Sequence, residues 1–141
     1  MLVSKSAIEE KGSAEALVGL DDPIRKWEQV GLLVYSDDEN FVKLIVEFID
    51  DSLYIVMARE LGNRGEVVAK VETGLQEAWI GYEVNGNQVR GLWREDTESE
   101  WIEAAVCEFP EDLNGRFAIF TQTGPEHEVR WATVKRVKVR L

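Results

Sequence analysis

The segment 29–61 constrains the fold of this chain more than any other part of the sequence. Two short acidic breaks divide it into three runs. In the middle run every second residue is apolar, namely Val42, Leu44, Val46 and Phe48. A repeat of two residues is typical of a half-buried strand, because a helix would scatter these side chains around its axis. The segment therefore predicts three consecutive antiparallel strands.

The two breaks also predict which residues face each other. A two-residue turn at the Asp-Asp break places Phe48 opposite Leu53. A four-residue turn through the preceding break, Asp-Asp-Glu-Asn, places Tyr35 opposite Val42 and puts Leu33 on the same buried face. We therefore expect Tyr35 and Leu33 in the core. A slip of one residue in either turn would reverse the faces.

A second hairpin is predicted around the turn pair Asn85 and Gly86, with Tyr82 opposite Val89. The predicted core face carries Ala78, Ile80, Tyr82, Val89, Gly91 and Trp93. The opposite face carries Trp79, Glu83, Gln88, Arg90, Leu92 and Arg94. This second face is mixed, because it places a tryptophan among charged groups.

Other short apolar runs complete an all-β pattern. They lie at 2–8, 14–20, 66–71, 101–109, 115–121 and 129–141. About ten short strands with tight turns and no convincing long helix indicate an antiparallel β-sandwich. A length of 141 residues suits one domain spanning 1–141, large enough to bury roughly 70% of its unfolded surface. No metal or disulfide is needed for such a chain to fold.

Charge and composition limit the partners. Sixteen basic and 27 acidic side chains give a net charge of −11, which disfavours nucleic acid and membrane surfaces. Cys107 is the single cysteine, so no internal disulfide and no cysteine-based metal cluster are expected. The start of the sequence lacks the pattern of a signal peptide, and we expect a cytoplasmic protein unless the chain is a segment of a longer one.

The string GLLVYSDDENFVKLIVE, preceded by Trp27, resembles the hallmark of concanavalin A-like jelly-roll domains. Such domains occur at the C-terminus of β-xylosidase-type glycoside hydrolases and in related stand-alone proteins. The 79–93 hairpin, Trp101 and the string GRFAIFTQTG are similar to later parts of that pattern, so the likeness covers about 19–141. It implies a jelly-roll sandwich acting as a non-catalytic recognition or accessory module, with carbohydrate as its ligand class.

Two departures from the family accompany this likeness. Only some 20 residues precede the match, where the family usually supplies a further N-terminal strand. The last strand has Thr133, Lys135 and Arg136 where many members have an acidic residue, so the structural calcium of some jelly rolls is not expected.

The mixed face is the leading candidate site. We predict that Trp79, Glu83, Arg90 and Arg94 share it with Lys43, Glu47 and Tyr54. Aromatic rings stack on the apolar face of a pyranose, while carboxylate and guanidinium groups bond its hydroxyls. The alternative is that a loop covers Trp79 and that the charges form weak cross-strand pairs. A further alternative is that a second copy of the chain buries this face or an edge strand in a homodimer.

Metal binding and catalysis have weaker candidates. Asp37, Asp38, Glu39 and Asn40 would supply oxygen ligands for calcium, but these are also the residues that tight turns prefer, and the same holds for Asp21 and Asp22. We predict neither a metal nor another cofactor. A glycosidase needs two carboxylates beside one bond, for which Glu47 and Glu83 are the available pair, and the Glu-x-Asp-x-x-Glu strand of jelly-roll glucanases is absent. We therefore predict no catalytic residues.

The remaining reactive or aromatic residues have ordinary structural roles in this interpretation. His127 is expected in a solvated loop, and Cys107 in the core as a small apolar residue. Trp93, Trp101 and Trp131 have the positions of core residues, which leaves Trp27 and Trp79 as surface plates. The basic side chains of the last strand, Arg130, Arg136, Lys138 and Arg140, are expected to pair with acidic neighbours.

Overall fold

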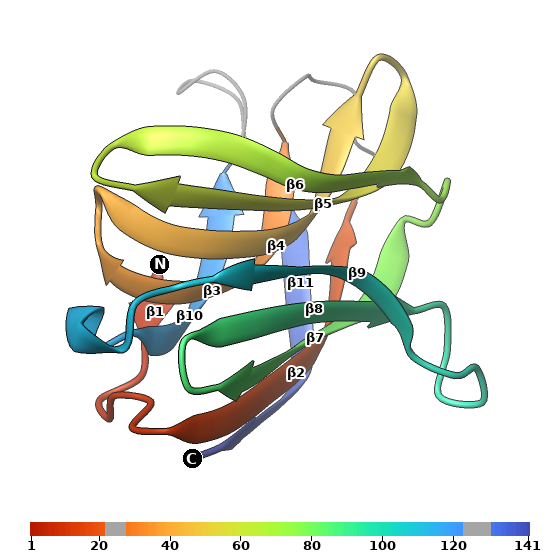
Figure 1. The fold of residues 1–141 in the computed structure, drawn as a ribbon. Helices are drawn as coiled ribbons and strands as arrows, with labels where there is room; N and C mark the ends of the chain where they lie inside the picture. The colour runs from red at the N-terminus through yellow and green to blue at the C-terminus, as the bar shows by residue number, and fades with distance from the viewer. Residues whose placement is uncertain (22–27, 123–130) are drawn as a thin grey trace.

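A computed structural model describes residues 1–21, 28–122 and 131–141. It contains eleven strands and one short 3₁₀ helix in these ranges (Figure 1). The first five strands are β1 (Leu2–Val3), β2 (Lys11–Leu20), β3 (Gln29–Asp37), β4 (Asn40–Ile49) and β5 (Ser52–Leu61). The others are β6 (Arg64–Glu72), β7 (Glu77–Asn85), β8 (Gln88–Arg94), β9 (Ile102–Glu108), β10 (Arg116–Gln122) and β11 (Ala132–Arg140), with η1 (Glu111–Leu113) before β10.

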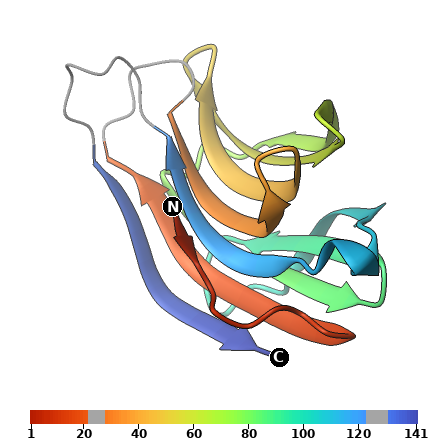
Figure 2. The ribbon, with the colours of Figure 1, turned by 90° about the vertical axis from the view of Figure 1, so that its left-hand side faces the viewer.

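The strands form two antiparallel sheets. The six-stranded sheet has the order β1-β10-β3-β4-β5-β6, and the five-stranded sheet has the order β11-β2-β7-β8-β9. The two sheets lie face to face, so the predicted antiparallel β-sandwich is confirmed. Figure 2 shows that the strands of both sheets bend in one direction, with the six-stranded sheet on the inner side of the bend. We therefore call its outer face the concave face, and the outer face of the five-stranded sheet the convex face.

The β4–β5 hairpin has the predicted register. Phe48 lies opposite Leu53, and every pair from Phe41 to Ile49 follows in step. The turn residues Asp50 and Asp51 have φ angles of 47° and 64°, which is the left-handed pair that a two-residue hairpin requires.

The β3–β4 register differs from the prediction by one residue. Val34, and not Tyr35, lies opposite Val42, and the pairing shifts between Tyr35 and Asp37. The Ser36 hydroxyl at this bulge donates a 2.6 Å hydrogen bond to the Leu113 carbonyl. Because a shift of one residue exchanges the two faces of a strand, Tyr35 and Leu33 point to the concave face.

The β7–β8 hairpin also differs in register but keeps its faces. Val84 lies opposite Val89 and Tyr82 opposite Gly91, two residues away from the predicted pairing. The two-residue loop is therefore Gly86 and Asn87, with Gly86 at a φ of 62°. A shift of two residues returns each side chain to the same face, so the predicted core face of this hairpin is confirmed.

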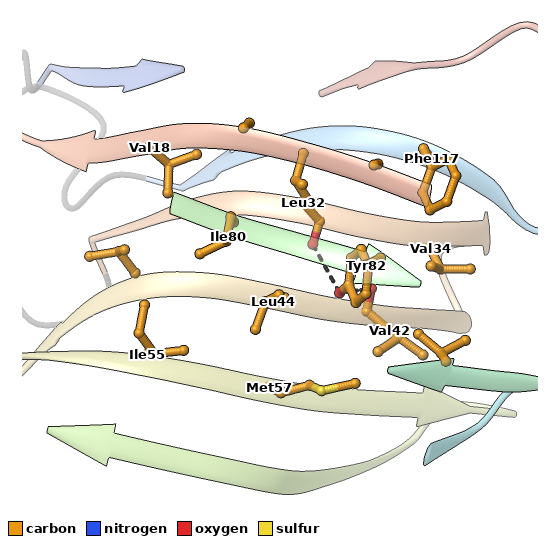
Figure 3. Close-up of a cluster of buried hydrophobic side chains, with 14 of the residues drawn as sticks. Val18, Leu32, Val34, Val42, Leu44, Ile55, Met57, Ile80, Tyr82 and Phe117 are labelled. Carbon is orange, nitrogen blue, oxygen red and sulfur yellow. Dashed lines mark hydrogen bonds between the residues drawn. The ribbon is translucent and has the colours of Figure 1, made fainter. Parts of the chain in front are cut away.

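The core lies between the sheets and is built from aliphatic side chains of both (Figure 3). Tyr82 stands at its centre and is 1% exposed. Its hydroxyl, from the five-stranded sheet, donates to the carbonyls of Leu32 and Val42 in the six-stranded sheet at 3.2 and 3.1 Å. Its ring stacks on Phe117, with 6.4 Å between ring centroids. Cys107 is buried in this core, as predicted.

The predictions for the last strand were wrong about burial. Trp131 is 69% exposed, and Val137, Val139 and Leu141 are exposed as well. The cause is that β11 is an edge strand whose pairing with β2 is interrupted between Lys135 and Lys138, where Arg136 has a φ of 53°. The sheets therefore do not close over these apolar side chains. Trp27 and His127 lie outside the described residues.

Within the described ranges, no helix is both long enough and apolar enough to cross a membrane.

Candidate functional site

The seven predicted binding residues are divided between the two outer faces of the sandwich. Four lie on the convex face, on β7 and β8, and three lie on the concave face, on β4 and β5. The convex group is Trp79, Glu83, Arg90 and Arg94, and the concave group is Lys43, Glu47 and Tyr54. The expectation that all seven share one surface is therefore wrong. Each face has to be considered by itself.

On the convex face the charged residues pair with one another. Arg90 contacts Glu83 at 3.0 Å and Glu103 at 2.8 Å across the neighbouring strands. Trp79 is only 9% exposed, and the Arg94 guanidinium lies 5.6 Å from its ring centroid. The charged residues of this face therefore form cross-strand ion pairs, as in the alternative interpretation. The Trp79 ring is largely buried and does not offer an exposed aromatic surface to a ligand.

On the concave face the predicted residues form part of a hydrogen-bonded chain. The Lys43 ammonium donates to Gln29 Oε1 at 3.2 Å, and Gln29 Nε2 donates to Glu47 Oε1 at 2.8 Å. Gln29 and Glu47 are direct partners in the β3–β4 ladder, and Tyr54 is opposite Glu47 in the β4–β5 ladder. The structure therefore brings Lys43, Glu47 and Tyr54 to one place.

This chain of polar groups is sunk into the face. Gln29 is 3% exposed and Glu47 is 4% exposed, although both point away from the sandwich core. Around them Leu33, Ile45 and Val56 are also buried on this side. A concave sheet crowds its outer side chains, and a buried carboxylate needs the hydrogen bond that Gln29 supplies.

A hollow of about 280 Å³ opens above these polar groups. Its floor includes Gln29 and Glu47, Lys43 and Phe41 stand at its side, and Val56 and Ala58 supply apolar wall. Tyr54 lies next to the hollow on β5, and the Lys70 ammonium lies 4.8 Å from the centroid of its ring. Aliphatic, aromatic, donor and acceptor groups thus meet within one small concavity.

Two turns that are hydrogen-bonded to each other lie near one end of the hollow. The β5–β6 turn donates from Gly62 N to Asn40 Oδ1 at 2.9 Å, and from Asn63 N to the Glu39 carbonyl at 3.0 Å. Asn40 and Glu39 belong to the β3–β4 turn. Glu60 and Gly65, which flank the β5–β6 turn, line the hollow.

Sequence reasoning did not identify Gln29 and Phe41 as site residues. Gln29 was missed because the predicted β3 register was off by one, which put the wrong side chains of β3 in the core. With the observed register, Gln29 falls on the same face as Glu47. Phe41 alternates with Val42 and was available from the same pattern, since it shares the parity of Lys43.

The acidic turn serves as a structural corner. Asp37 Oδ1 accepts hydrogen bonds from Glu39 N at 2.8 Å and from Asn40 Nδ2 at 3.0 Å, and Tyr35 donates to Asp38 at 2.6 Å. The bond from Glu39 N is the largest reason that the pKa of Asp37 is lowered. In the described ranges, no group of three or more His, Cys, Asp or Glu side chains is placed to hold a metal ion.

The nominated catalytic pair is separated by the sandwich. Glu47 lies on the concave face and Glu83 on the convex face, so the two carboxylates do not flank one bond. The Cys107 thiol is also unsuited to nucleophilic chemistry near neutral pH, because burial raises its pKa to about 11.

This geometry defines a class of fold, the two-sheet antiparallel β-sandwich, which is the architecture that the sequence resemblance implied. No family model matches the chain, and no curated protein matches it by sequence. Solved structures do match. The GH43 BlXynB protein from Bacillus licheniformis superimposes with a TM-score of 0.84 at 15% identity, over 97% of this chain and 28% of that one.

Two shorter proteins also share the fold. A functionally unknown protein from Saccharomyces cerevisiae has a TM-score of 0.81 at 16% identity, over 94% of this chain and 70% of that one. The carbohydrate binding module CBM66 from Bacillus subtilis has a TM-score of 0.68 at 12% identity, over 99% of this chain and 80% of that one. The chain thus spans less than a third of the GH43 protein and most of the other two.

Proposed function

We propose that this protein is a non-catalytic carbohydrate-binding module and that its site is the hollow of the concave face. The observation that carries the proposal is the hydrogen-bonded chain of Lys43, Gln29 and Glu47 at the base of that hollow. Burying these polar side chains on an outer sheet face costs free energy, which their mutual hydrogen bonds only partly offset. The same side chains can donate hydrogen bonds to a ligand and accept hydrogen bonds from it.

The chemistry of the hollow suits a sugar. A pyranose presents hydroxyls around its rim and C–H groups on its faces. Lys43 offers donors and Glu47 offers acceptors, and Glu47 Oε2 makes no hydrogen bond to any residue that the structure describes. Phe41 lines the hollow and supplies an aromatic surface, and Tyr54 is opposite Glu47 in the β4–β5 ladder.

The comparisons support the same ligand class. One solved relative of the fold is described as a carbohydrate binding module, and another is part of a GH43 protein. We therefore infer a recognition or accessory role beside a carbohydrate-active enzyme. The experiment below does not depend on this likeness.

The proposal is tested by a matched pair of carboxylate variants, one on each face. Purified wild type, Glu47→Gln and Glu103→Gln are first screened on a glycan array, and titration calorimetry then measures affinity for the best ligand. We expect Glu47→Gln to weaken binding by about tenfold, because one charge-assisted hydrogen bond is lost. Glu103→Gln, on the convex face and away from both hollows, should bind that ligand as wild type does.

Two results would contradict the proposal. One is that no glycan binds the wild type, and the other is that both variants bind equally well. Sedimentation equilibrium separates this function from the alternative of a homodimer. A monomer supports an accessible site, whereas a tight dimer in which the Tyr54 ring is protected from solvent supports burial of the concave face by a second copy.

A further inference from the structure

The convex face has a hollow of its own, of about 170 Å³. It is lined by residues of β2, β7, β8 and β11 and by Trp101, which directly precedes β9, and these residues include Glu15, Gly81, Glu83, Lys138 and Arg140. The thickness of the sandwich separates this convex-face hollow from the concave-face hollow described above. Any binding here is therefore independent of the proposed site.

Trp101 forms one wall of the convex-face hollow, so the prediction that it lies in the core was wrong. It is half-buried and stands over Gly81, since a Cβ atom added to Gly81 would lie 3.5 Å from its Cη2 atom. The Arg94 guanidinium lies 4.3 Å from the Trp101 ring centroid and 5.6 Å from that of Trp79. Arg94 does not line the hollow, so we infer that it braces one side of the Trp101 ring and leaves the other side to the hollow.

The loop before Trp101 is held in place by its own hydrogen bonds. Asp96 Oδ1 accepts from Glu98 N at 3.0 Å, from Ser99 N at 2.8 Å and from Ser99 Oγ at 2.9 Å. The Asp96 pKa is lowered, most of all by the bond from the Ser99 side chain, so its carboxylate is charged at neutral pH. The aromatic wall is therefore fixed before any ligand arrives, which reduces the entropy cost of binding.

The opposite wall is cationic. Lys138 and Arg140 are exposed on β11 and make no ion pair with any residue in the described ranges. Glu83 does not neutralise them, because its carboxylate is bonded to Arg90. Glu15 is opposite Lys138 in the β2–β11 ladder, without a contact within ion-pair distance. Two unpaired cations in a chain of net charge −11 indicate a place for an anionic group.

We propose that the convex-face hollow is a second saccharide site, and that it takes a sugar ring carrying a carboxylate. The ring lies against Trp101, the carboxylate lies between Lys138 and Arg140, and Glu15 accepts a hydrogen bond from a ring hydroxyl. A single negative charge suits two cations with Glu15 beside them. Polyphosphates and nucleic acid are repelled by the acidic surroundings.

The test compares two ligands that differ only in the charged group, methyl β-glucuronide and methyl β-glucoside, with the corresponding galactose pair beside them. Titration of ¹⁵N-labelled protein follows the indole N–H signals, assigned through Trp101→Phe. We expect a uronide to shift the Trp101 signal and to bind at least about tenfold more tightly than its neutral partner. Added salt should lower the affinity for the uronide and leave the affinity for the neutral sugar unchanged.

Substitutions in the protein identify the side chains that cause the preference for the uronide. The double substitution Lys138→Gln and Arg140→Gln changes two exposed side chains and should preserve the fold, which circular dichroism checks. We expect it to remove the preference for the uronide, while the matched double substitution Lys5→Gln and Arg64→Gln, of two exposed cations that line neither hollow, leaves that preference intact. The proposal is overturned if neither uronide binds, if uronide and neutral sugar bind alike, or if Glu47→Gln is the change that abolishes uronide binding. Failure here leaves the concave-face proposal standing, because that site is tested by different variants.

Discussion

At the scale of single residues, Glu47 is a charged side chain that is buried on the outer, concave face of a bent sheet (Figure 2). A glutamate on the outer face of a flat sheet is normally solvated. Here the bend of the sheet buries it to 4% exposure, and Gln29 offsets part of the cost with one hydrogen bond. The same bend gives Gln29 its burial and creates the hollow above both residues.

Gly31 permits this close packing at the centre of the concave face. A Cβ atom added there would lie 2.7 Å from Ile45 Cα and would overlap the Leu44 carbonyl oxygen, both in the backbone of β4. We predict that Gly31→Ala lowers the free energy of unfolding by about 3 kcal/mol, because β3 and β4 must move apart. Urea denaturation followed by circular dichroism measures this loss.

Gly65→Ala is the matched control. The nearest atom to its added Cβ is the Glu60 carboxylate oxygen at 3.4 Å, which is free to move. Its unfolding free energy should remain within about 0.5 kcal/mol of the wild-type value. Equal losses of unfolding free energy in the two variants would contradict our explanation that the close approach of Gly31 to β4 excludes a larger side chain there.

At the scale of elements, the two turns that were misplaced from sequence had unequal consequences. The β7–β8 turn was displaced by two residues and every face was still predicted correctly. The β3–β4 turn was displaced by one residue, and the faces of β3 were exchanged. The shift occurs at Ser36, whose hydroxyl donates a hydrogen bond to the carbonyl of Leu113, a residue 77 positions away. Local turn preferences contain no information about such a contact.

Strand identity, fold class and the β4–β5 register were accessible from sequence because they depend on periodicity and nearby turn residues. The candidate site was accessible only in part. Lys43, Glu47 and Tyr54 were assigned to one surface correctly, since they belong to one hairpin whose register was right. Their grouping with Trp79, Glu83, Arg90 and Arg94 was wrong, because the sheet to which each hairpin belongs is decided by long-range pairing.

The β4–β5 turn offers a prediction at this scale. Asp50 and Asp51 both have left-handed φ angles, which non-glycine residues adopt at a cost, and their like charges are adjacent. Replacing the pair by Asn-Gly, through Asp50→Asn and Asp51→Gly, should raise the free energy of unfolding by about 1 kcal/mol. The measurement is the same urea denaturation.

Glu39→Gly provides the comparison for this turn. Glu39 occupies the β3–β4 turn and does not have a left-handed φ angle. Glycine there should be neutral or destabilising, because it only increases the freedom of the unfolded chain. A gain in stability from Glu39→Gly as large as that from the Asn-Gly pair would contradict our explanation.

At the scale of the whole molecule, Tyr82 connects the two sheets through a polar contact in an apolar core. Its hydroxyl donates to carbonyls of β3 and β4, and burial raises its pKa well above the usual value, so it remains a donor at any ordinary pH. We predict that Tyr82→Phe lowers the free energy of unfolding by about 1 kcal/mol and leaves ligand binding on either face unchanged.

Tyr35→Phe is the control for this loss. The Tyr35 hydroxyl donates to Asp38 within a surface turn, where water replaces the lost bond. Its effect on unfolding should be clearly smaller than that of Tyr82→Phe. Equal losses of unfolding free energy in the two variants would contradict the expected stabilisation by the hydrogen bonds between the sheets.

The two bonded turns near the concave-face hollow are structurally separate from the polar groups at its base. Gln29 and Glu47 are paired in the β3–β4 ladder, whereas the turns are joined by hydrogen bonds from Gly62 to Asn40 and from Asn63 to Glu39. Loops of other lengths grafted at the β5–β6 turn would reshape the entrance without displacing the groups on the floor. If the concave-face hollow binds a ligand as proposed, the size of the entrance and the chemistry of the base could be changed independently.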